Sequence, residues 1–464
     1  MDAEGRGRDD DRGGPGRLAG PALDPAAEYN RLLAADESAA AEQAASLPDA
    51  FTAAGITFDG RPMRTFLRPH FVARHQWERL RGDGRRLLEL AARVARRAFD
   101  GDARRLCAFL GTPEAEARWV SVDPGPPDVV LSRLDAFLGP AGARFIELNN
   151  DAPAGFGYGD RMAEVFARLP VFRAFARRWA VAYRPSTPAL VEAVLGAAPP
   201  GLVSAPTVAI ADWAEVKTRA DQQILQSAFA ARGARCLLAD PRAMELRAGR
   251  LWAGSVPVDV VYRRAVLSEL VQREDEVSGF LRGYAERRAV FVNSFRCRLS
   301  EDKAFLALLT DEDFVPLLSD AERTLVARTV PWTRKLEERR TSKDGQEVDL
   351  LRFVREHRER LVLKPAHAYG GHDVLVGDEA GAAAWDEAVR AGTGRAWVVQ
   401  ERVAIPEEPF PAWVDGRLRF EDLKVNVNPF YVAGAEVGAV ARASRQAVIN
   451  VSAGGGSVPA FVVG

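Results

Sequence analysis

Lysine is the scarcest of the charged residue types in this chain of 464 residues. Lysine and arginine together number 63, but lysine occurs only at Lys217, Lys303, Lys335, Lys343, Lys364 and Lys424. Arginine can replace lysine as a surface charge. It cannot do so freely where a site needs a compact ammonium group, because the planar guanidinium has a different shape. The six lysines are therefore the first candidates for functional residues, although Lys343, within Thr341-Ser-Lys-Asp-Gly345, is expected to be exposed in a loop.

Cysteine and histidine are also rare, and neither forms a familiar metal-binding pattern. Cys107, Cys236 and Cys297 are widely spaced, which argues against a disulfide framework and against a structural zinc site. His367 and His372 lie close together, but one pair without a third ligand is a weak indication of zinc. The composition therefore predicts a reducing, cytoplasmic environment.

The chain lacks an excess of charge of one sign and long apolar runs. Its formal net charge is -1, which provides no overall attraction to nucleic acid or to an anionic membrane. No stretch approaches the roughly 20 apolar residues of a membrane span. Residues 1–25 are rich in Gly, Arg, Asp and Pro and contain no apolar segment of a signal peptide. We predict a soluble cytoplasmic protein with a disordered tail at 1–25 and no nucleic-acid or membrane partner.

Three common catalytic patterns are missing from the sequence. There is no GxxxxGK[ST] phosphate loop, and the run Gly155-Phe-Gly-Tyr-Gly159 does not match the GxGxxG dinucleotide pattern. There is also no GxSxG element that would place a serine nucleophile. These absences favour chemistry that does not pass through a covalent enzyme intermediate.

The remaining 47% hydrophobic composition supports a full core, and its periodicity predicts a mixture of helices and strands. Residues 26–110 follow a helical pattern, with strands at 128–132 and 143–149 and a helix at 160–179. Beyond Pro199-Pro200-Gly201, strands and a helix alternate in a βαβ pattern up to about residue 290. The last part contains a helix at 301–309 and strands at 361–365, 396–401 and 447–451. We therefore predict three units at 26–200, 201–290 and 291–464.

Polar residues follow several of these predicted strands. Arg263 and Arg264 end the strand at 258–264, and ligands of open α/β sheets bind beyond the carboxyl ends of strands. They are candidate substrate-binding residues, with ordinary surface arginines as an equally supported alternative. Lys364 ends another strand, directly before Pro365 and a glycine-containing loop. A lysine there can reach phosphate oxygens, and the scarcity of lysine favours this interpretation over an ordinary strand end.

Two further strands carry candidate ligands. Glu147 and Asn149 point to the same side of one strand, because side chains at i and i+2 share a face. Carboxylate and amide oxygens of this kind suit Mg²⁺. Trp397-Val-Val-Gln-Glu401 is a buried type of strand that ends in polar groups, which suits recognition of adenine by its backbone. Each of these motifs is weak when taken alone.

Taken together and in this order, the motifs resemble the circularly permuted branch of the ATP-grasp superfamily. That branch includes the glutathionylspermidine synthetase-like ligases and the eukaryotic-type glutathione synthetases. In ordinary ATP-grasp proteins the Glu-x-Asn motif follows both nucleotide lysines, whereas here Glu147-Leu-Asn149 precedes Lys303 and Lys364. The resemblance extends from about Arg64 to the C-terminus. Its most specific parts are Arg133-Leu-Asp135 with 145–155, Leu363-Lys-Pro with 369–371, and Arg442-Ala-Ser444 with 450–456.

The resemblance implies an α+β or α/β protein with a circularly permuted ATP-grasp fold. The 26–200 unit would contain a helical N-terminal region and the metal-binding segment, the 201–290 unit would be a Rossmann-like substrate domain, and the 291–464 unit would bind the nucleotide. ATP and Mg²⁺ would be the cofactors. The residues implied are Lys303, Lys364, Gly370 and Gly371 for phosphate, Gln400, Glu401 and Val403 for adenine, Glu147 and Asn149 for Mg²⁺, Arg133 and Arg442 for catalysis, and Asp135 for substrate.

The implied reaction is an ATP-dependent ligation of a carboxylate to an amine through an acyl phosphate. Amino acids, peptides and polyamines all remain open as substrates. The sequence also departs from the family pattern, because Ala366-His367-Ala368 stands where relatives often have an acidic metal ligand. Asp373 is one residue that could substitute for it. A phosphotransferase on the same fold and a degenerate nucleotide-binding scaffold are the alternatives.

Overall fold

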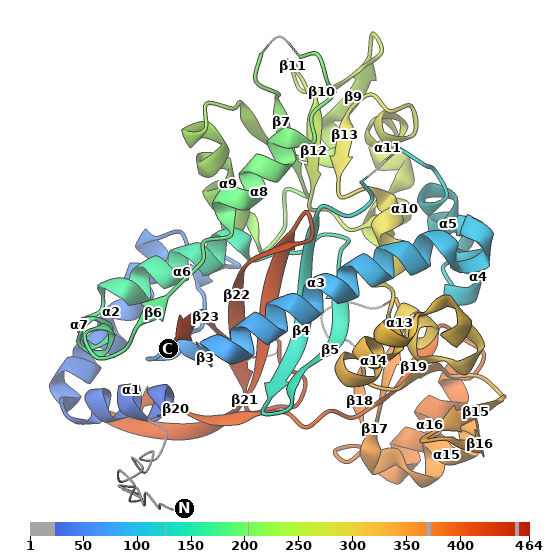
Figure 1. Cartoon of the computed structure of the whole chain (residues 1–464). Coiled ribbons are helices and arrows are strands. Elements are labelled where there is room, and N and C mark those ends of the chain that lie inside the picture. Colours follow the sequence, from blue (N-terminus) through green and yellow to red (C-terminus); the bar gives the residue numbers. More distant parts are fainter. Residues whose placement is uncertain (1–23, 126, 203, 368–372, 451–453) are drawn as a thin grey trace, which may run out of the picture.

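The computed structural model describes residues 24–125, 127–202, 204–367, 373–450 and 454–464. Figure 1 shows three sheet-containing regions, with helices packed around each of them. The long strands of the largest sheet stand at the centre. A parallel sheet lies above them in this view, and a smaller antiparallel sheet lies to their right. The elements that meet between these regions form the site described below.

The largest sheet among the described residues has eight strands and combines the two ends of the chain. Six of them follow the order β3-β23-β22-β21-β4-β5, while β20 pairs with β21 and β6 pairs with β23. The strands are β3 (His70–Ala73), β4 (Leu131–Gly139), β5 (Gly142–Asn149), β6 (Val181–Ala182), β20 (Glu407–Val414), β21 (Arg417–Val432), β22 (Ala435–Ser444) and β23 (Gly456–Val463). Only the β3–β23 pair among them is parallel. The hairpin β4–β5, which carries Glu147 and Asn149, therefore lies beside C-terminal strands.

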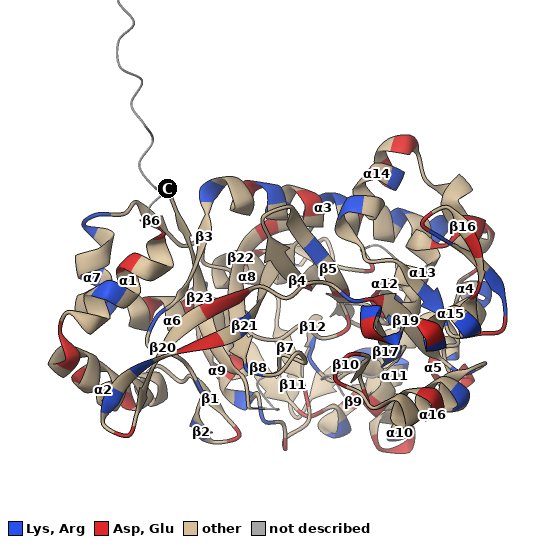
Figure 2. Ribbon diagram, turned by 90° about the horizontal axis from the view of Figure 1, so that it is seen from below, with Lys and Arg blue, Asp and Glu red and all other residues tan. Residues whose placement is uncertain are grey.

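Helix α3 (Arg74–Arg97) crosses one side of this sheet (Figure 1). Its apolar stripe, which includes Leu80 and Leu87, is buried, as expected for an amphipathic helix. At Gly84 the helix approaches β21 so closely that an added Cβ would lie 1.9 Å from the hydroxyl oxygen of Tyr431. That hydroxyl donates a hydrogen bond to the Leu80 carbonyl at 3.2 Å. The outer side of α3 carries interspersed basic and acidic residues (Figure 2), which form ion pairs three and four positions apart.

Further helices surround the β3–β23 end of the sheet and the far end of α3. At the first end lie α1 (Pro25–Ala34), α2 (Glu37–Ala53), α6 (Phe156–Arg168) and α7 (Pro170–Ala176), while α8 (Thr187–Gly196) contacts α6 and α9 (Arg219–Ala231). Beside the other lie α4 (Ala103–Leu110) and α5 (Glu114–Val120). A small hairpin of β1 (Thr57–Phe58) and β2 (Arg61–Pro62) contacts α2 and α9. Short 3-10 helices occupy Ala98–Gly101, Pro241–Ala243, Glu274–Val277, Phe295–Cys297, Glu312–Leu317 and Arg358–Arg360.

The middle of the chain forms a parallel sheet in the order β13-β12-β7-β8. Its strands are β7 (Val208–Ala211), β8 (Cys236–Ala239), β12 (Val260–Arg263) and β13 (Val290–Val292), with helices α9 (Arg219–Ala231), α10 (Leu267–Gln272) and α11 (Ser278–Ala285). Every residue of β7 and β12 is buried, as is typical of parallel strands covered on both faces. A small antiparallel sheet of β9 (Met244–Arg247), β10 (Arg250–Ala253) and β11 (Val256–Pro257) is attached to it.

The third region is built on an antiparallel sheet in the order β14-β19-β17-β18. Its strands are β14 (Thr333–Lys335), β17 (Leu361–Pro365), β18 (Leu375–Val376) and β19 (Trp397–Glu401). The hairpin β15 (Arg340–Lys343)–β16 (Gln346–Asp349) forms a separate two-stranded sheet. The helices of this region are α12 (Arg298–Glu301), α13 (Lys303–Thr310), α14 (Asp320–Thr329), α15 (Leu350–Glu356) and α16 (Ala382–Gly392).

Several predictions about local structure were wrong. The helical pattern of 26–110 is interrupted by β1, β2 and β3. The expected helix 160–179 is two helices, because Pro170 begins α7 and cannot continue α6. The expected helix 301–309 is divided at Asp302, whose side chain caps α13. Residues 447 and 448 form bends and residues 449 and 450 have no regular structure, so the expected strand is absent from 447–450, while Val451 lies outside the described residues.

The predicted division into units can be compared with the sheets. The parallel sheet covers most of the predicted 201–290 unit and extends to Val292. The largest sheet joins β4 and β5 of the 26–200 unit to the C-terminal strands of the 291–464 unit. Helix α1 begins at Pro25, at the end of the predicted tail. Within the described part of the chain, none of the helices is both long and apolar enough to cross a membrane.

Candidate functional site

A cavity of about 950 Å³ lies where the three regions meet. Its floor consists of the largest sheet, one wall comes from β17, β19 and the start of α13, and the opposite rim comes from the parallel-sheet region. Among the predicted site residues, those that line it are Arg133, Asp135, Glu147, Asn149, Lys303, Lys364, Gln400, Glu401, Val403 and Arg442. The predicted residues Gly370 and Gly371 lie outside the described part of the chain.

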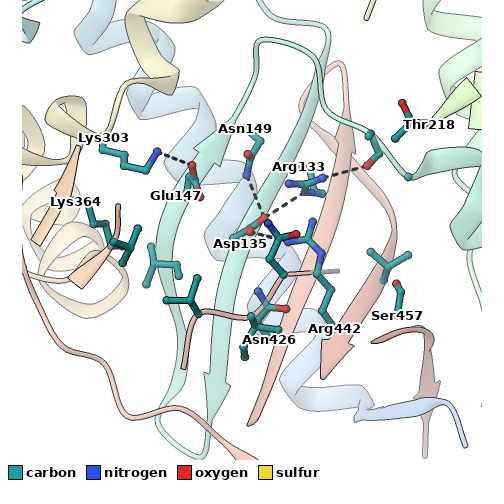
Figure 3. A pocket seen from close by; sticks show the side chains of 18 of the residues that line it. Arg133, Asp135, Glu147, Asn149, Thr218, Lys303, Lys364, Asn426, Arg442 and Ser457 are labelled. Atoms are coloured by element: carbon teal, nitrogen blue, oxygen red, sulfur yellow. Dashed lines mark hydrogen bonds and ion pairs between the residues drawn. The ribbon is translucent and has the colours of Figure 1, made fainter. Parts of the chain in front are cut away.

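The hairpin β4–β5 presents four polar side chains to this cavity (Figure 3). Arg133 and Asp135 are two residues apart on β4, and Glu147 and Asn149 are two residues apart on β5, so the side chains of each pair point to the same face. The register pairs Arg133 with Asn149 and Asp135 with Glu147. The two carboxylates therefore stand on directly opposed residues, next to a register shift between Asp135 and Ala136.

Asp135 is the centre of the charge network on the sheet. Its Oδ1 accepts hydrogen bonds from Arg133 Nε at 3.2 Å and from Asn149 Nδ2 at 3.1 Å. Its Oδ2 accepts one from Arg442 Nη1 at 3.2 Å. Burial by itself would raise the pKa of Asp135, but the guanidinium groups of Arg133 and Arg442 lower it below its ordinary value. Asp135 is therefore ionised at neutral pH and neutralises two arginines.

The polar row continues onto the C-terminal strands. Asn426 on β21 is opposite Arg442 on β22, and Arg442 is in turn opposite Ser457 on β23. All three side chains line the cavity (Figure 3). Burial and the nearby charge of Arg133 lower the pKa of Arg442 to about 10. This residue is still a cation at neutral pH, in a site where a bound anion would relieve its repulsion from Arg133.

Two lysines enter the cavity from different elements. Lys303 is the first residue of α13, and its Nζ lies 2.9 Å from Glu147 Oε1. Lys364 lies on β17, and its Nζ donates a hydrogen bond to Gln400 Oε1 at 2.7 Å. Gln400 Nε2 donates to Thr333 Oγ1 at 3.0 Å, which fixes the direction of the amide. Burial, opposed by Glu147 and reinforced by Lys303, lowers the pKa of Lys364 to about 8.

Beyond Lys364 the wall of the cavity becomes mainly apolar. Gln400, Glu401 and Val403 lie at and beyond the end of β19. The apolar side chains around them are Val362, Val374, Val376, Ile405, Val448 and Ile449. The Glu401 carboxylate is held by Lys343, whose Nζ lies 3.1 Å from Glu401 Oε1, and by Arg144 at 3.9 Å. A flat apolar group would fit between these side chains with polar groups along one edge.

The opposite rim carries charges of both signs. Trp213 Nε1 donates to Glu269 Oε2 at 2.7 Å, and the Arg273 guanidinium carbon lies 4.1 Å from the Trp213 ring centroid. Glu215 forms ion pairs with Arg273 at 3.1 Å and with Arg242 at 2.8 Å. The cavity therefore has a mainly apolar wall at one end and a rim of paired acidic and basic groups at the other. Four cations line the part between them: Arg133, Lys303, Lys364 and Arg442.

A family model covers the part of the chain that contains these residues. The model for circularly permuted ATP-grasp type 2 proteins matches residues 129–445. This chain belongs to the circularly permuted ATP-grasp family. The match includes every predicted site residue, from Arg133 to Arg442. The predicted family and fold are therefore confirmed.

Two solved structures are similar to this chain. A glutathione synthetase-like effector from Globodera pallida, solved in its apo form, is 13% identical in sequence, with a TM-score of 0.62 over 91% of this chain and 96% of that one. A candidate gamma-glutamylcysteine synthetase from Methylobacillus flagellatus KT is 12% identical, with a TM-score of 0.40 over 82% of this chain and 86% of that one. No curated protein sequence matches this chain significantly. The first likeness shows that the two chains share a fold over nearly their whole lengths.

The structure does not bring Arg263 and Arg264 into the ATP-grasp cavity. Arg263 Nη1 lies 2.5 Å from Asp151 Oδ1, and both side chains are buried. Arg264 Nη1 lies 3.2 Å from Asp221 Oδ2, again with both side chains buried. The two arginines do stand at the carboxyl end of β12, but their side chains form ion pairs with the buried carboxylates of Asp151 and Asp221. Their visible role is to attach β12 to the loop after β5 and to α9.

Several residues of the site were missed in the sequence. Asn426, Ser457 and Thr218 line the cavity, but nothing in their local sequence distinguishes them from other polar residues. Lys343 was expected to be exposed in its loop, yet its side chain is only 12% exposed and contacts Glu401. The scarcity of lysine was a signal for Lys343 as well, but the contact depends on how the β15–β16 hairpin packs against β19.

Proposed function

We propose that this protein is an ATP-dependent ligase that joins a carboxylate to an amine through an acyl phosphate. The observation that carries the proposal is the convergence of Lys303, Lys364, Arg133 and Arg442 on one cavity that also contains Glu147 and Asn149. Four cations beside a carboxylate and an amide suit a polyanionic substrate together with its metal ion. Membership of the ATP-grasp family supports ATP as that polyanion.

Different parts of the cavity wall suit the triphosphate, the adenine and the ribose of ATP. The triphosphate would lie between Lys364 and Lys303, whose ammonium groups come from β17 and α13. The adenine would enter the apolar wall beside Gln400 and Val403. Glu401 stands at the end of β19, where its carboxylate could accept hydrogen bonds from ribose hydroxyl groups. The lowered pKa of Lys364 is consistent with this arrangement, since its buried ammonium has no carboxylate of the described residues within hydrogen-bonding distance and would gain from a phosphate.

The donor set fits Mg²⁺. Glu147 and Asn149 lie two residues apart on the same face of β5, and both line the cavity. These are the hard oxygen ligands that Mg²⁺ prefers, and the ion usually completes its shell with phosphates and water. Among the described residues no group of three or more His, Cys, Asp and Glu side chains forms a metal site by itself. A bound Mg²⁺ would neutralise phosphate charge.

The reaction requires no enzyme nucleophile. A substrate carboxylate oxygen attacks the terminal phosphorus of ATP, the bond to the bridging oxygen breaks, and ADP leaves. The amine nitrogen then attacks the carbonyl carbon of the acyl phosphate, the carbon–oxygen bond breaks, and phosphate and a proton are released. Arg133 and Arg442 stand on neighbouring parts of the sheet, where they can neutralise the carboxylate and the transferred phosphoryl group. Positioning and charge stabilisation thus supply the catalysis.

The substrate class is supported by the rim and by the similar structures. The paired charges of Glu215, Glu269 and Arg273 suit a substrate with both amine and carboxylate groups. The protein from Globodera pallida is named as glutathione synthetase-like, which supports an amino acid or a peptide as one substrate. At 13% identity its sequence is too distant to decide which one.

The decisive experiment is a screen for ADP release in the presence of Mg-ATP, with amino acids, short peptides and polyamines offered in pairs. Mass spectrometry of the product should show an amide whose formation matches the ADP released. Lys364→Ala should lower the rate by about 10²–10³. Lys335→Ala is the matched control, because Lys335 pairs with Glu337 and does not line the cavity. Phosphorylated product without an amide would indicate a phosphotransferase, and Mg-ATP binding without turnover would indicate a scaffold.

A further inference from the structure

Asp302 and His367 connect the two elements that carry the phosphate lysines. Asp302 directly precedes Lys303, and His367 follows Lys364 by three positions. The carboxylate of Asp302 is in direct contact with His367 Nδ1. A backbone hydrogen bond runs beside this contact, from Lys303 N to the Ala366 carbonyl at 3.3 Å. The start of α13 and the end of β17 are thus connected by one side-chain contact and one backbone hydrogen bond.

The partners of His367 define its charge. Its Nδ1 faces the Asp302 carboxylate, and its Nε2 lies 2.8 Å from the Gly111 carbonyl oxygen at the end of α4. The Asp302 carboxylate and the Gly111 carbonyl are both acceptors, so a protonated ring, which can donate from both nitrogens, suits these partners best. Burial alone would oppose this, but the hydrogen bond and charge of Asp302 raise the pKa of His367 above its ordinary value.

Asp302 uses its two carboxylate oxygens for different purposes. Oδ1 accepts a hydrogen bond from Ala304 N at 2.8 Å and caps α13, while Oδ2 faces His367. The residue is 2% exposed, so its charge is compensated by the imidazolium and not by water. One side chain therefore orients the helix that begins with Lys303 and also contacts the segment that follows Lys364.

Glu301, the residue before Asp302, connects the start of α13 to the residues that follow β5. Glu301 Oε2 accepts a hydrogen bond from Asn150 N at 2.7 Å and also contacts Asp151 N. These amides follow directly after Asn149 at the end of β5. Glu301, Asp302 and Lys303 therefore join three parts of the site in sequence order: the end of β5, the end of β17, and the Glu147 carboxylate.

We propose that Asp302 and His367 are a positioning pair that sets the spacing of Lys303 and Lys364 around the ATP triphosphate. The pair touches neither the cavity nor the reacting atoms, and it acts through the two lysines. This inference rests on the proposed function, because it assumes that the lysines bind phosphate. It predicts that losing the pair weakens the binding of the triphosphate and leaves the binding of the adenosine part unchanged.

The test uses the full-length protein and compares the dissociation constants of Mg-ATP and of AMP by calorimetry. Asp302→Asn retains a side-chain oxygen that can cap α13 but removes the charge that faces His367. His367→Gln removes the cation and leaves the cap intact. Each variant should raise the Kd of Mg-ATP about tenfold, the effect expected from losing one charged hydrogen bond, and should not change the Kd of AMP.

Asp349→Asn is the matched control. Asp349 also caps a helix of the same region, α15, by accepting from Arg352 N at 2.9 Å, but it has no histidine partner. This variant should not change either Kd. The double variant Asp302→Asn/His367→Gln should bind Mg-ATP no more weakly than either single variant, because the two residues act as one pair.

The outcomes separate this inference from the proposed function. Mg-ATP binding by Asp302→Asn and His367→Gln that equals the wild type would overturn the positioning pair but not the ligase. An equal loss of ATP and AMP affinity would also overturn it, because a general structural defect affects both nucleotides. Additive losses in the double variant would show that the residues act independently, again against the proposal. A wild-type protein that binds no nucleotide would overturn the proposed function itself.

Discussion

Lys303 Nζ lies 2.9 Å from Glu147 Oε1, although the two residues belong to different regions of the molecule. Glu147 stands on β5 of the largest sheet, and Lys303 begins α13 beside the antiparallel sheet. The ion pair therefore connects the predicted metal ligand to a predicted phosphate ligand across the cavity. With Mg-ATP bound, the metal ion and the lysine would share the negative charge of Glu147 and of the phosphates.

Glu147→Gln tests this relationship. The amide has nearly the same shape, but it removes the negative charge that both Lys303 and a metal ion would face. We expect the Mg²⁺ concentration for half-maximal ADP release to rise and the maximal rate to fall by about 10²–10³. Glu337→Gln is the control, since Glu337 pairs with Lys335 outside the cavity. If Glu147→Gln has the metal dependence of the wild type, Glu147 is not a metal ligand.

Lys364 gives the site a pH dependence on the alkaline side. Burial, the largest cause, lowers its pKa from the ordinary 10.5 to about 8, so its ammonium group loses its proton as the pH rises through 8. A neutral amine attracts phosphate less, and the Kd of ATP should therefore increase above pH 8. Lys364→Met lacks this group, and its weaker ATP binding should show no such increase in that range.

The lowered pKa of Lys364 also affects stability: the free energy of unfolding should rise over the pH range in which ATP affinity falls. Between pH 8 and 10.5 the unfolded chain would bind a proton at Lys364 that the nucleotide-free folded chain does not bind. The free energy of unfolding should therefore rise with pH in this window, relative to Lys364→Met. Urea unfolding of both proteins on either side of pH 8 measures the difference. A difference that falls with pH would contradict the lowered pKa.

The fold and much of the site could be predicted from the sequence because the informative residues are local. Glu147-Leu-Asn149 and Leu363-Lys-Pro are short motifs on single strands, and their order along the chain is directly visible. Strand alternation also places Arg133 and Asp135 on one face without any knowledge of the partner strands. These features led to the family and to ten residues that line one cavity.

The remaining features depend on contacts between distant parts of the chain. Arg263 ends its strand as expected, but the sequence contains no sign that Asp151 would bind its side chain. The pairing of Asp302 with His367 likewise requires α13 and β17 to be adjacent. Lys343 looked exposed because its hairpin is polar, and only the packing of that hairpin places it beside Glu401. Side-chain partners of this kind are set by tertiary structure, which local patterns do not contain.

Asp135→Asn removes the negative charge of this residue but keeps its size and one side-chain oxygen that can accept hydrogen bonds. The carboxylate now compensates both Arg133 and Arg442, and its removal leaves two cations close together on a buried part of the sheet. Removing one partner of a buried ion pair costs about 3–5 kcal/mol, so the free energy of unfolding should fall by an amount of that order. Saturating ATP should restore part of the loss, since phosphate would compensate the arginines. Equal losses with and without ATP would show that the arginines do not face the nucleotide.

Arg263→Met tests the structural role of the arginine that the sequence suggested for substrate binding. The variant leaves Asp151 as a buried carboxylate without its cation, which should lower the free energy of unfolding by about 3–5 kcal/mol. Arg250→Met is the control, because Arg250 forms an exposed ion pair with Asp259 and should cost no more than about 1 kcal/mol. Urea unfolding measures both changes. At a temperature where Arg263→Met is folded, its KM for each substrate should equal that of the wild type, since the guanidinium lies outside the cavity. A selective rise in one KM with little loss of stability would instead place Arg263 in substrate recognition.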